Sequence, residues 1–381
     1  MSGAPVLLFS NGDGDAEFFY ACRFDVERAA YLGFAPGDDL LIVRDMELER
    51  ARAESSARRV VLAEELGYTL GAREEAAWAK AVAGALGERS MRQVRVSPNM
   101  RIAYQEGLAE AGVEVAEIDH ALFTAERRRK SPEEGSFIHA AQRAAEAACV
   151  EVISRIGAAE AREGLLWDGG RPLTSERLKA EAERVLTEIG YAAGEMIVAG
   201  PPQSAQPHNG GTGQIRAGGP IVIDIFPRGR TSRYCGDLTR TVVAGEPPPE
   251  VGRMHAAVCA ALDAGAALLR EGANGRDVHR AACRVLVEAG FGTNTAGLEG
   301  APGGARMIHS LGHGVGLQVH EEPGLRDLDV TLRAGDVVTV EPGLYLANLG
   351  GVRVEDTGMV TQEGFKNYSS ISRSLDPRAY M

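Results

Sequence analysis

Apolar and polar residues alternate in short blocks along the N-terminal third of the chain. Short apolar runs, which are typical of strands, cover residues 5–10, 40–44, 93–97 and 113–118. Apolar residues at helical spacing predict helices over residues 47–66 and 73–87. This alternation of strands and helices predicts a small α/β domain.

A strong helix start follows this region. Residues 126–130 read ERRRK, a basic run that we expect to be a solvated linker. The next four residues, 131–134, read SPEE and form a capping box with proline in the first turn of a helix that is predicted to reach about residue 156. We therefore predict an N-terminal α/β domain over residues 1–128 and a second domain over residues 129–381.

Helices precede strands twice in this second domain. Helical spacing predicts a further helix over residues 176–189, followed by a strand over residues 195–199 and two more strands. Two helices, over residues 249–269 and 276–289, then precede a second strand-rich block. The repeated order predicts an α+β domain with a duplicated plan.

The two strand-rich blocks carry acidic residues at matching positions. In each block the tripeptide Arg-Ala-Gly, at residues 216–218 and 333–335, precedes a Val-rich or Ile-rich strand that ends in an acid eight residues after the arginine. A second acid comes shortly before a threonine in the next strand. The four acids are Asp224 and Asp237 in the first block and Glu341 and Glu355 in the second. Pairing of these strands would bring four carboxylates to one place.

Four carboxylates in one interior cavity repel one another and hold protons. Two divalent cations would cancel the four negative charges, and two metal ions about 3.5–4 Å apart form a common hydrolytic centre. Imidazole ligands are available in residues 308–323, IHSLGHGVGLQVHEEP, which contain His309, His313 and His320. The glycines beside His313 permit close approach of the backbone to a ligand or to another strand. The sequence therefore predicts a metal centre between the two blocks.

The composition narrows the classes of function. The chain has 381 residues, 44% hydrophobic and 25% charged, as in soluble proteins of two domains. Its 41 basic and 53 acidic residues give a net charge of −12, which argues against nucleic acid as a partner. No apolar run is long enough for a membrane span and no secretory signal is visible, so we expect a cytoplasmic protein without a membrane partner. The five cysteines lack a CxxC spacing and are expected to be reduced thiols.

Five ordered blocks in the second domain resemble the pita-bread metallopeptidases, the superfamily of Xaa-Pro aminopeptidase, prolidase (Xaa-Pro dipeptidase), methionine aminopeptidase and creatinase. The blocks are Pro207-His208-Asn209, Asp224 with residues 236–241 (GDLTRT), residues 309–323 (HSLGHGVGLQVHEEP), residues 339–345 (TVEPGLY) and residues 351–356 (GVRVED). The resemblance implies an α+β fold in which residues 129–381 form a pita-bread catalytic domain with duplicated helix–strand halves. Residues 1–128 resemble the smaller α/β domain of creatinase, prolidase and aminopeptidase P in size and alternation only.

The resemblance also implies a role for each ligand of the metal centre. Asp224 would bind the first metal ion, and Asp237 and Glu355 would bridge the two ions. His313 and Glu341 would complete the ligands of the second ion. A hydroxide bridging the ions would attack the scissile carbonyl, since metal binding lowers the pKa of water toward neutrality, and Glu341 would take and relay the proton. Carboxylates with one imidazole suit Mn²⁺ better than thiolate-preferring Zn²⁺, although Co²⁺ or Zn²⁺ could also support turnover.

Further residues would surround the substrate. The resemblance places His208, His309 and His320 around it, where they would polarise the carbonyl or line the proline pocket, His208 and His320 with catalytic roles. Tyr345 and Arg353 would line or brace the site. Arg353 shares a strand face with the nearby bridging acid, so we expect it to hold a bridging carboxylate in place.

The loop between the two aspartates departs from the family. Thirteen residues lead from Asp224 to Asp237, two more than is common in the family, and the loop over residues 227–233 carries three arginines. Two extra residues preserve strand parity, so both acids can still face one side. The loop either captures a substrate carboxylate or is a solvent-facing hairpin tip. Arg326 is either a second candidate for that carboxylate or a surface residue.

The resemblance implies a dinuclear metallopeptidase that hydrolyses the Xaa-Pro bond of a small peptide with proline in second position, and it implies a homodimer. We favour an Xaa-Pro dipeptidase over an Xaa-Pro aminopeptidase that acts on longer peptides. A 381-residue chain with a short N-terminal domain and extra arginines in the loop fits the bacterial dipeptidase-like members of the family better. Two other interpretations stay open: a creatinase-type hydrolase without metal ions, and a binding protein that kept the fold without catalysis. Ordinary roles are expected for His120, His139, His255 and His279.

Overall fold

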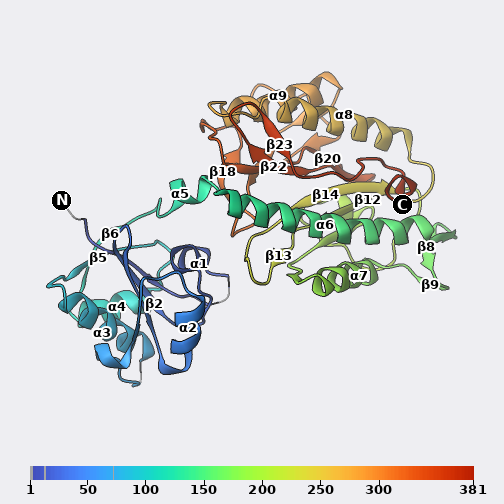
Figure 1. Ribbon diagram of the computed structural model, residues 1–381. Helices are drawn as coiled ribbons and strands as arrows, with labels where there is room; N and C mark the ends of the chain where they lie inside the picture. The colour runs from blue at the N-terminus through green and yellow to red at the C-terminus, as the bar shows by residue number, and fades with distance from the viewer. Residues whose placement is uncertain (1–2, 13, 72) are drawn as a thin grey trace. The chain divides into compact units, whose positions relative to one another are not determined.

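The computed structural model describes residues 3–12, 14–71 and 73–381. Contacts within the chain divide it into two compact units, Met1–Arg127 and Arg128–Met381, coloured blue to teal and green to red in Figure 1. The four acids and the histidines of the predicted metal centre all lie in the second unit.

The first unit is a mixed sheet covered by helices on both faces. Its strands are β1 (Val6–Phe9), β2 (Ala30–Ala35), β3 (Asp38–Val43), β4 (Arg59–Leu62), β5 (Gln93–Val96) and β6 (Glu114–Ile118), in the order β4-β3-β2-β1-β5-β6. Its helices are α1 (Ala16–Cys22), α2 (Leu48–Glu54), α3 (Glu74–Gly87) and α4 (Ile102–Glu110), and α5 (Thr124–Arg128) leads out of it. Leu7 and Phe9 of β1 pack in the core with α3 and α4, whereas Val6 and Leu8 pack in the core with α1 and α2. Alternate side chains of β1 thus belong to two hydrophobic cores, one on each face of the sheet.

The helix predicted over residues 47–66 is wrong in its second half. Helix α2 ends at Glu54, and Arg59–Leu62 forms strand β4, which pairs in parallel with β3. Val60 and Val61 are β-branched and favour a strand, and the serines at residues 55–56 interrupt the helical run. The α/β character predicted for this region is confirmed.

Helix α6 (Pro132–Ala158) opens the second unit. Ser131 caps it with both hydrogen bonds of the predicted capping box, which join its hydroxyl and backbone N–H to Glu134. Helix α6 packs beside α7 (Ser175–Glu188) against an antiparallel sheet of order β11-β12-β14. The strands here are β7 (Glu160–Arg162), β8 (Leu165–Asp168), β9 (Arg171–Pro172), β10 (Tyr191–Ala192), β11 (Ile197–Ala199), β12 (Pro220–Ile225), β13 (Arg228–Gly229) and β14 (Leu238–Val243).

The second half of this unit repeats the order of helices and then strands. Helices α8 (Pro249–Ala266) and α9 (Gly275–Glu288) precede two sheets, of order β15-β16-β20-β21 and β18-β17-β19-β22-β23. The strands are β15 (Gly292–Thr293), β16 (Arg306–Met307), β17 (Gly312–Gly314), β18 (Glu321–Leu325), β19 (Val337–Val340), β20 (Gly343–Leu346), β21 (Gly350–Arg353), β22 (Asp356–Val360) and β23 (Phe365–Asn367). Figure 1 shows α8 and α9 on one side of the strands and α6 and α7 on the other.

The first half turns its acids away from its own hydrophobic core. Alternate residues of β12 pack beneath α6 and α7: Ile221, Ile223 and Ile225. Asp224 therefore faces the opposite side of the sheet. It pairs with Thr239 across the ladder, and Asp237 comes two residues before Thr239, so both acids share one face.

The glutamates of the second half also face away from the hydrophobic core of their own half. Val340 of β19 packs in the core beneath α8 and α9, so Thr339 and Glu341 face away from that core. Thr339 pairs with Thr357 of β22, which puts Glu355, two residues before Thr357, on the same face. The predicted duplicated plan of helices followed by acid-bearing strands is present in the structure.

Candidate metal centre

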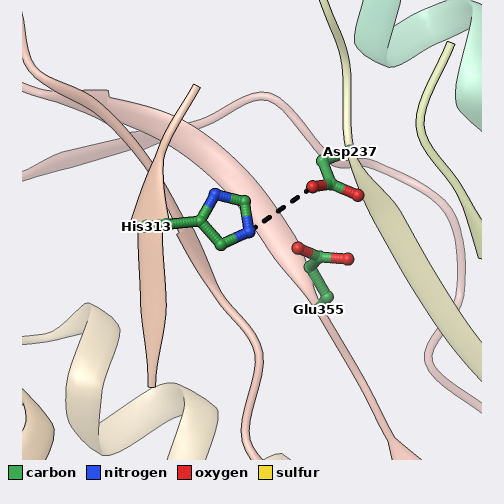
Figure 2. Close-up of side chains that lie close together, drawn as sticks. All are labelled: Asp237, His313 and Glu355. Carbon is green, nitrogen blue, oxygen red and sulfur yellow. Dashed lines mark ion pairs between the residues drawn. The ribbon is translucent and has the colours of Figure 1, made fainter. Parts of the chain in front are cut away.

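Side chains from distant strand ends meet on this shared face. The ligand atoms of Asp237, His313 and Glu355 all lie within 4.8 Å of one another, and Figure 2 shows the three side chains pointing toward one another. His313 Nε2 is 3.6 Å from Asp237 Oδ2 and 3.3 Å from Oε1 of Glu341. Asp237 and Glu355 are buried, while His313 and Glu341 are half-buried. Folding thus brings together four of the five predicted ligands directly.

Strand β17 presents His313 from a tightly packed position. A Cβ on Gly312 would lie 2.1 Å from the carbonyl oxygen of Thr339, so only glycine permits this approach of β17 to β19. The backbone N–H of His313 donates to Thr339 Oγ1 at 3.0 Å, and its Nδ1 donates to the carbonyl of Gly314 at 3.2 Å. That second bond leaves Nε2 as the atom aimed at the carboxylates, which is the usual arrangement of a ligating histidine.

Asp224, the fifth predicted ligand, is held by a buried guanidinium. Arg353 Nη2 donates to Asp224 Oδ2 at 2.6 Å. Arg353 Nε donates to Thr239 Oγ1 at 3.2 Å, and the Thr239 hydroxyl donates to Glu355 Oε2 at 2.9 Å. The sequence led us to expect Arg353 on a bridging carboxylate, whereas its ion pair is with Asp224, because β21 lies beside β12.

Two buried carboxylate oxygens of this cluster have no hydrogen-bond partner within the described part of the chain. They are Asp224 Oδ1 and Glu355 Oε1. A buried ionised oxygen is costly unless a donor or a cation compensates it. Both oxygens belong to predicted ligands, so a bound cation would satisfy them.

Burial and mutual repulsion govern the protonation of the cluster. Burial, together with the charges of neighbouring carboxylates, raises the pKa values of Asp237 and Glu355 well above their usual range. Burial also raises the pKa of Glu341, but the hydrogen bond from His313 and its charge outweigh it and lower that pKa to about 2. Burial lowers the pKa of His313, and Glu341 outweighs it in turn, so that pKa is raised. Without cations, Asp237 and Glu355 therefore bind their protons more tightly than exposed carboxyl groups do.

The donor set fits divalent cations that accept oxygen and imidazole ligands. Carboxylates and one imidazole suit Mn²⁺ and related ions. Cations here would replace the protons of two acids and satisfy the two unpaired oxygens. The residues present therefore fit a metal centre.

His309 and Tyr345 form a hydrogen-bonded pair beside the carboxylates. His309 Nδ1 donates to the carbonyl of Ser310 at 2.7 Å, so Nε2 accepts from the Tyr345 hydroxyl at 2.9 Å. Arg353 Nη1 donates to the same hydroxyl oxygen at 2.8 Å. Burial lowers the pKa of His309, so the ring is neutral at neutral pH.

His320 and His208 face solvent near the ligands. The ring centroids of His320 and His313 are 4.1 Å apart. Burial of its ring and then the charge of His313 lower the pKa of His320. The carbonyl of Pro207, the residue before His208, accepts from Arg353 Nη1 at 3.4 Å. Both histidines are exposed and so accessible to a substrate.

The arginines considered for a substrate carboxylate include two exposed residues of the second unit. Arg326 is exposed, and its Nη2 is 3.1 Å from Glu322 Oε1. Arg230 in the loop over residues 227–233 is also exposed. Strand β13 pairs the start of this loop with β10, and the exposed Arg230 lies just beyond that pairing. A role in binding a substrate carboxylate stays a prediction for both.

One histidine that the sequence marks as ordinary contacts the backbone of this centre. His279 of α9 is buried, its Nδ1 accepts from the N–H of Leu311 at 3.2 Å, and its Nε2 donates to Thr295 Oγ1 at 2.8 Å. The Leu311 carbonyl accepts from the N–H of Glu341 at 2.8 Å. The sequence could indicate only that His279 lies on a predicted helix. It could not indicate that its ring accepts a hydrogen bond from Leu311.

Comparison with known proteins identifies a family that matches most of the second unit. The model of metallopeptidase family M24 matches residues 136–362, more than half of the chain. An Xaa-Pro dipeptidase from Pyrococcus furiosus is 34% identical over 183 residues, 48% of this chain and 49% of that protein. The chain thus spans about half the length of the curated relatives it matches.

Solved structures share the fold over nearly the whole chain. An Xaa-Pro dipeptidase from Bacillus anthracis gives a TM-score of 0.81 at 23% identity, covering 98% of this chain and 94% of that one. An X-Pro aminopeptidase from Thermotoga maritima gives 0.79 at 22% identity, covering 97% and 96%. These likenesses confirm the predicted α+β pita-bread fold class. Among the described residues, no helix combines the length and apolarity that crossing a membrane requires.

Proposed function

The chain belongs to metallopeptidase family M24, and on that premise we propose that it hydrolyses Xaa-Pro peptide bonds with two divalent metal ions. The proposed substrate is a small peptide with proline in second position. We favour an Xaa-Pro dipeptide over longer peptides, in line with the relatives named Xaa-Pro dipeptidase. Mn²⁺ is the metal that the ligand set favours, with Co²⁺ or Zn²⁺ as substitutes.

The observation that carries the proposal is the cluster of buried carboxylates around His313. Asp237 and Glu355 have raised pKa values because burial and neighbouring carboxylates disfavour their charges. Two oxygens of the cluster lack a hydrogen bond among the residues described. A purely structural acid cluster would be a net cost to the fold, whereas divalent ions would make it favourable.

We assign the ligands as follows. Asp224 would hold the first ion, Asp237 and Glu355 would be shared between the two ions, and His313 and Glu341 would complete the ligands of the second. Two divalent ions at this centre supply Lewis acidity for the substrate carbonyl and a water whose pKa is lowered toward neutrality. Glu341 is ionised at neutral pH, so its carboxylate could accept a proton from the attacking water and pass it to the leaving nitrogen.

The other residues of the centre orient the substrate. Tyr345 is fixed between His309 and Arg353, so its hydroxyl is held in one position. His320, whose ring lies beside that of His313, and the exposed His208 are proposed to face the substrate and to stabilise charge that develops on its carbonyl. Arg326 and the loop over residues 227–233 are proposed to attract the carboxylate of a dipeptide.

We propose that residues 129–381 are the catalytic domain and residues 1–128 an accessory domain. We also propose a cytoplasmic homodimer. Sedimentation of the purified protein tests the dimer, since a monomer at micromolar concentration would contradict it.

One assay tests the reaction and the preferred length of substrate. Protein loaded with Mn²⁺ is given Xaa-Pro dipeptides, Xaa-Pro tripeptides and matched Xaa-Ala controls. Cleavage of the dipeptides with little cleavage of the tripeptides or controls is the expected result. Cleavage of tripeptides at the first bond would instead indicate an aminopeptidase.

Two results would contradict peptidase activity. Purified protein that binds no divalent metal would favour a metal-free creatinase-type hydrolase. Protein that binds the metal but cleaves no peptide of the panel would favour a binding protein that kept the fold.

A further inference from the structure

Gln142 of α6 contacts the metal centre from outside the group of proposed ligands. Its side chain is fully buried, and both ends of its amide are used. The Oε1 atom accepts from the backbone N–H of Asp237 at 2.9 Å, and Nε2 donates to Ser369 Oγ at 3.0 Å. Gln142 is 95 residues from Asp237 in sequence, so no local pattern could reveal this contact.

The contact is part of a closed ring of hydrogen bonds. Ser369 Oγ also accepts from the N–H of Thr357 at 3.1 Å, and the Thr357 hydroxyl donates to the carbonyl of Asp237 at 2.7 Å. Asp237 lies one residue before β14 begins. The position of its peptide groups therefore depends on two side chains, those of Gln142 and Thr357.

The backbone around this ring has little room to adjust. A Cβ on Gly236, next to Asp237, would lie 2.5 Å from the carbonyl carbon of Ala141 and 2.7 Å from the nitrogen of Gln142. Helix α6 therefore approaches the segment before β14 as closely as glycine allows. A loss of the Gln142 amide would leave the N–H of Asp237 buried without its acceptor, which favours a shift of this segment.

We propose that Gln142 is a positioning residue that fixes the carboxylate of Asp237 for metal binding. The inference rests on the proposed function, since it takes Asp237 as a bridging ligand. Gln142 does not touch the metal ions or the substrate, and it acts through the backbone of Asp237. Outer partners of metal ligands typically change affinity by about 10–100-fold when they are removed.

The test compares Gln142→Met with a control on the same helix. Glu146 of α6 is also buried and accepts from the backbone N–H of Ile371 at 3.1 Å, in the same C-terminal segment as Ser369. Glu146→Met therefore removes a buried acceptor without touching Asp237. The Kd of metal-free protein for Mn²⁺ is measured by titration calorimetry, and the Tm of each metal-free variant by differential scanning calorimetry.

We expect Gln142→Met to weaken Mn²⁺ binding about tenfold or more, and Glu146→Met to lower the Tm with a Kd within about threefold of the parent. Equal weakening in both variants, or no weakening in Gln142→Met, would overturn the inference and show a role in folding alone. Should Gln142→Met fail to fold, Ser369→Ala opens the ring more mildly, and an unchanged Kd there would count against the proposal. Parent protein that binds no Mn²⁺ would instead refute the proposed function.

Discussion

At the scale of one residue, Glu355 shows how the fold holds a buried carboxyl group of the metal centre in place. Its Oε2 accepts from the Thr239 hydroxyl, and its backbone N–H donates to the Thr239 carbonyl at 3.0 Å. Its Oε1 has no hydrogen-bond partner among the residues described. Burial and the charges of Glu341 and Asp224 raise the pKa of Glu355. The side chain is thus fixed in place by Thr239, while its Oε1 lacks a partner and its ionisation is disfavoured.

This raised pKa predicts how the metal-free protein responds to pH. The folded state holds the proton of Glu355 more tightly than the unfolded chain, so this contribution to stability is complete below the usual pKa of 4.5. It is lost as the pH rises through the raised pKa of the folded state. As the pH rises above 4.5 we therefore expect the Tm of metal-free protein to fall, and to fall less in Glu355→Gln, which cannot titrate.

Calorimetry of both proteins in matched buffers checks this expectation. Saturating Mn²⁺ is the control, because cations take the place of the protons and should flatten the slope of the parent protein. Parallel slopes for parent and Glu355→Gln without metal would show that this carboxylate is not a source of the pH dependence.

At the scale of one element, strand β17 depends on its glycines. Gly312 and Gly314 flank His313, and each would bring a Cβ within 2.5 Å of a backbone oxygen of a neighbouring strand. The strand is short, yet its packing sets where Nε2 of His313 points. The glycines that the sequence marks beside this histidine therefore serve close strand packing.

Gly312→Ala is expected to destabilise the protein by about 1–3 kcal/mol, because its methyl group meets the backbone of β19. It should also weaken Mn²⁺ binding, since β17 carries His313. Gly252→Ala in α8 is the matched control: its Cβ meets nothing within 4 Å, so it should stabilise by about 0.5–1 kcal/mol. Urea unfolding measures the change in the free energy of unfolding of each variant. A Gly312→Ala protein as stable as its parent would show that β17 does not need glycine to pack against β19.

At the scale of the whole second unit, both halves supply proposed ligands to one centre. Asp224 and Asp237 come from the first half, and His313, Glu341 and Glu355 from the second. Each half has its own hydrophobic core, and the acids lie where the two halves meet. Bound cations would therefore join the halves as well as serve the reaction.

Mn²⁺ at a hundred times its Kd is expected to raise the free energy of unfolding by about 2.7 kcal/mol, through binding to the folded state alone. Asp237→Ala should abolish this gain, because it removes a bridging ligand. Denaturant unfolding with and without Mn²⁺, with Mg²⁺ as the control ion, measures the effect. Equal stabilisation of parent and Asp237→Ala would place the bound ion away from this centre.

Some features of this protein follow from the sequence by itself, because they depend on local geometry. The strand period of two turns Asp224 and Glu341 away from the isoleucines and valines beside them. The capping box at Ser131 forms as expected, since its bonds join residues three apart. The matching spacing of acids in two blocks was enough to predict that four carboxylates gather.

Other features were decided only by the tertiary structure, because they join segments distant in the chain. Arg353 pairs with Asp224 across 129 residues, and Gln142 reaches Asp237 across 95. Residues Arg59–Leu62 form a strand, where the sequence predicts a helix, because they pair with the edge of β3. Periodicity fixes which side of an element a residue faces, but the partner it meets there depends on how the elements pack.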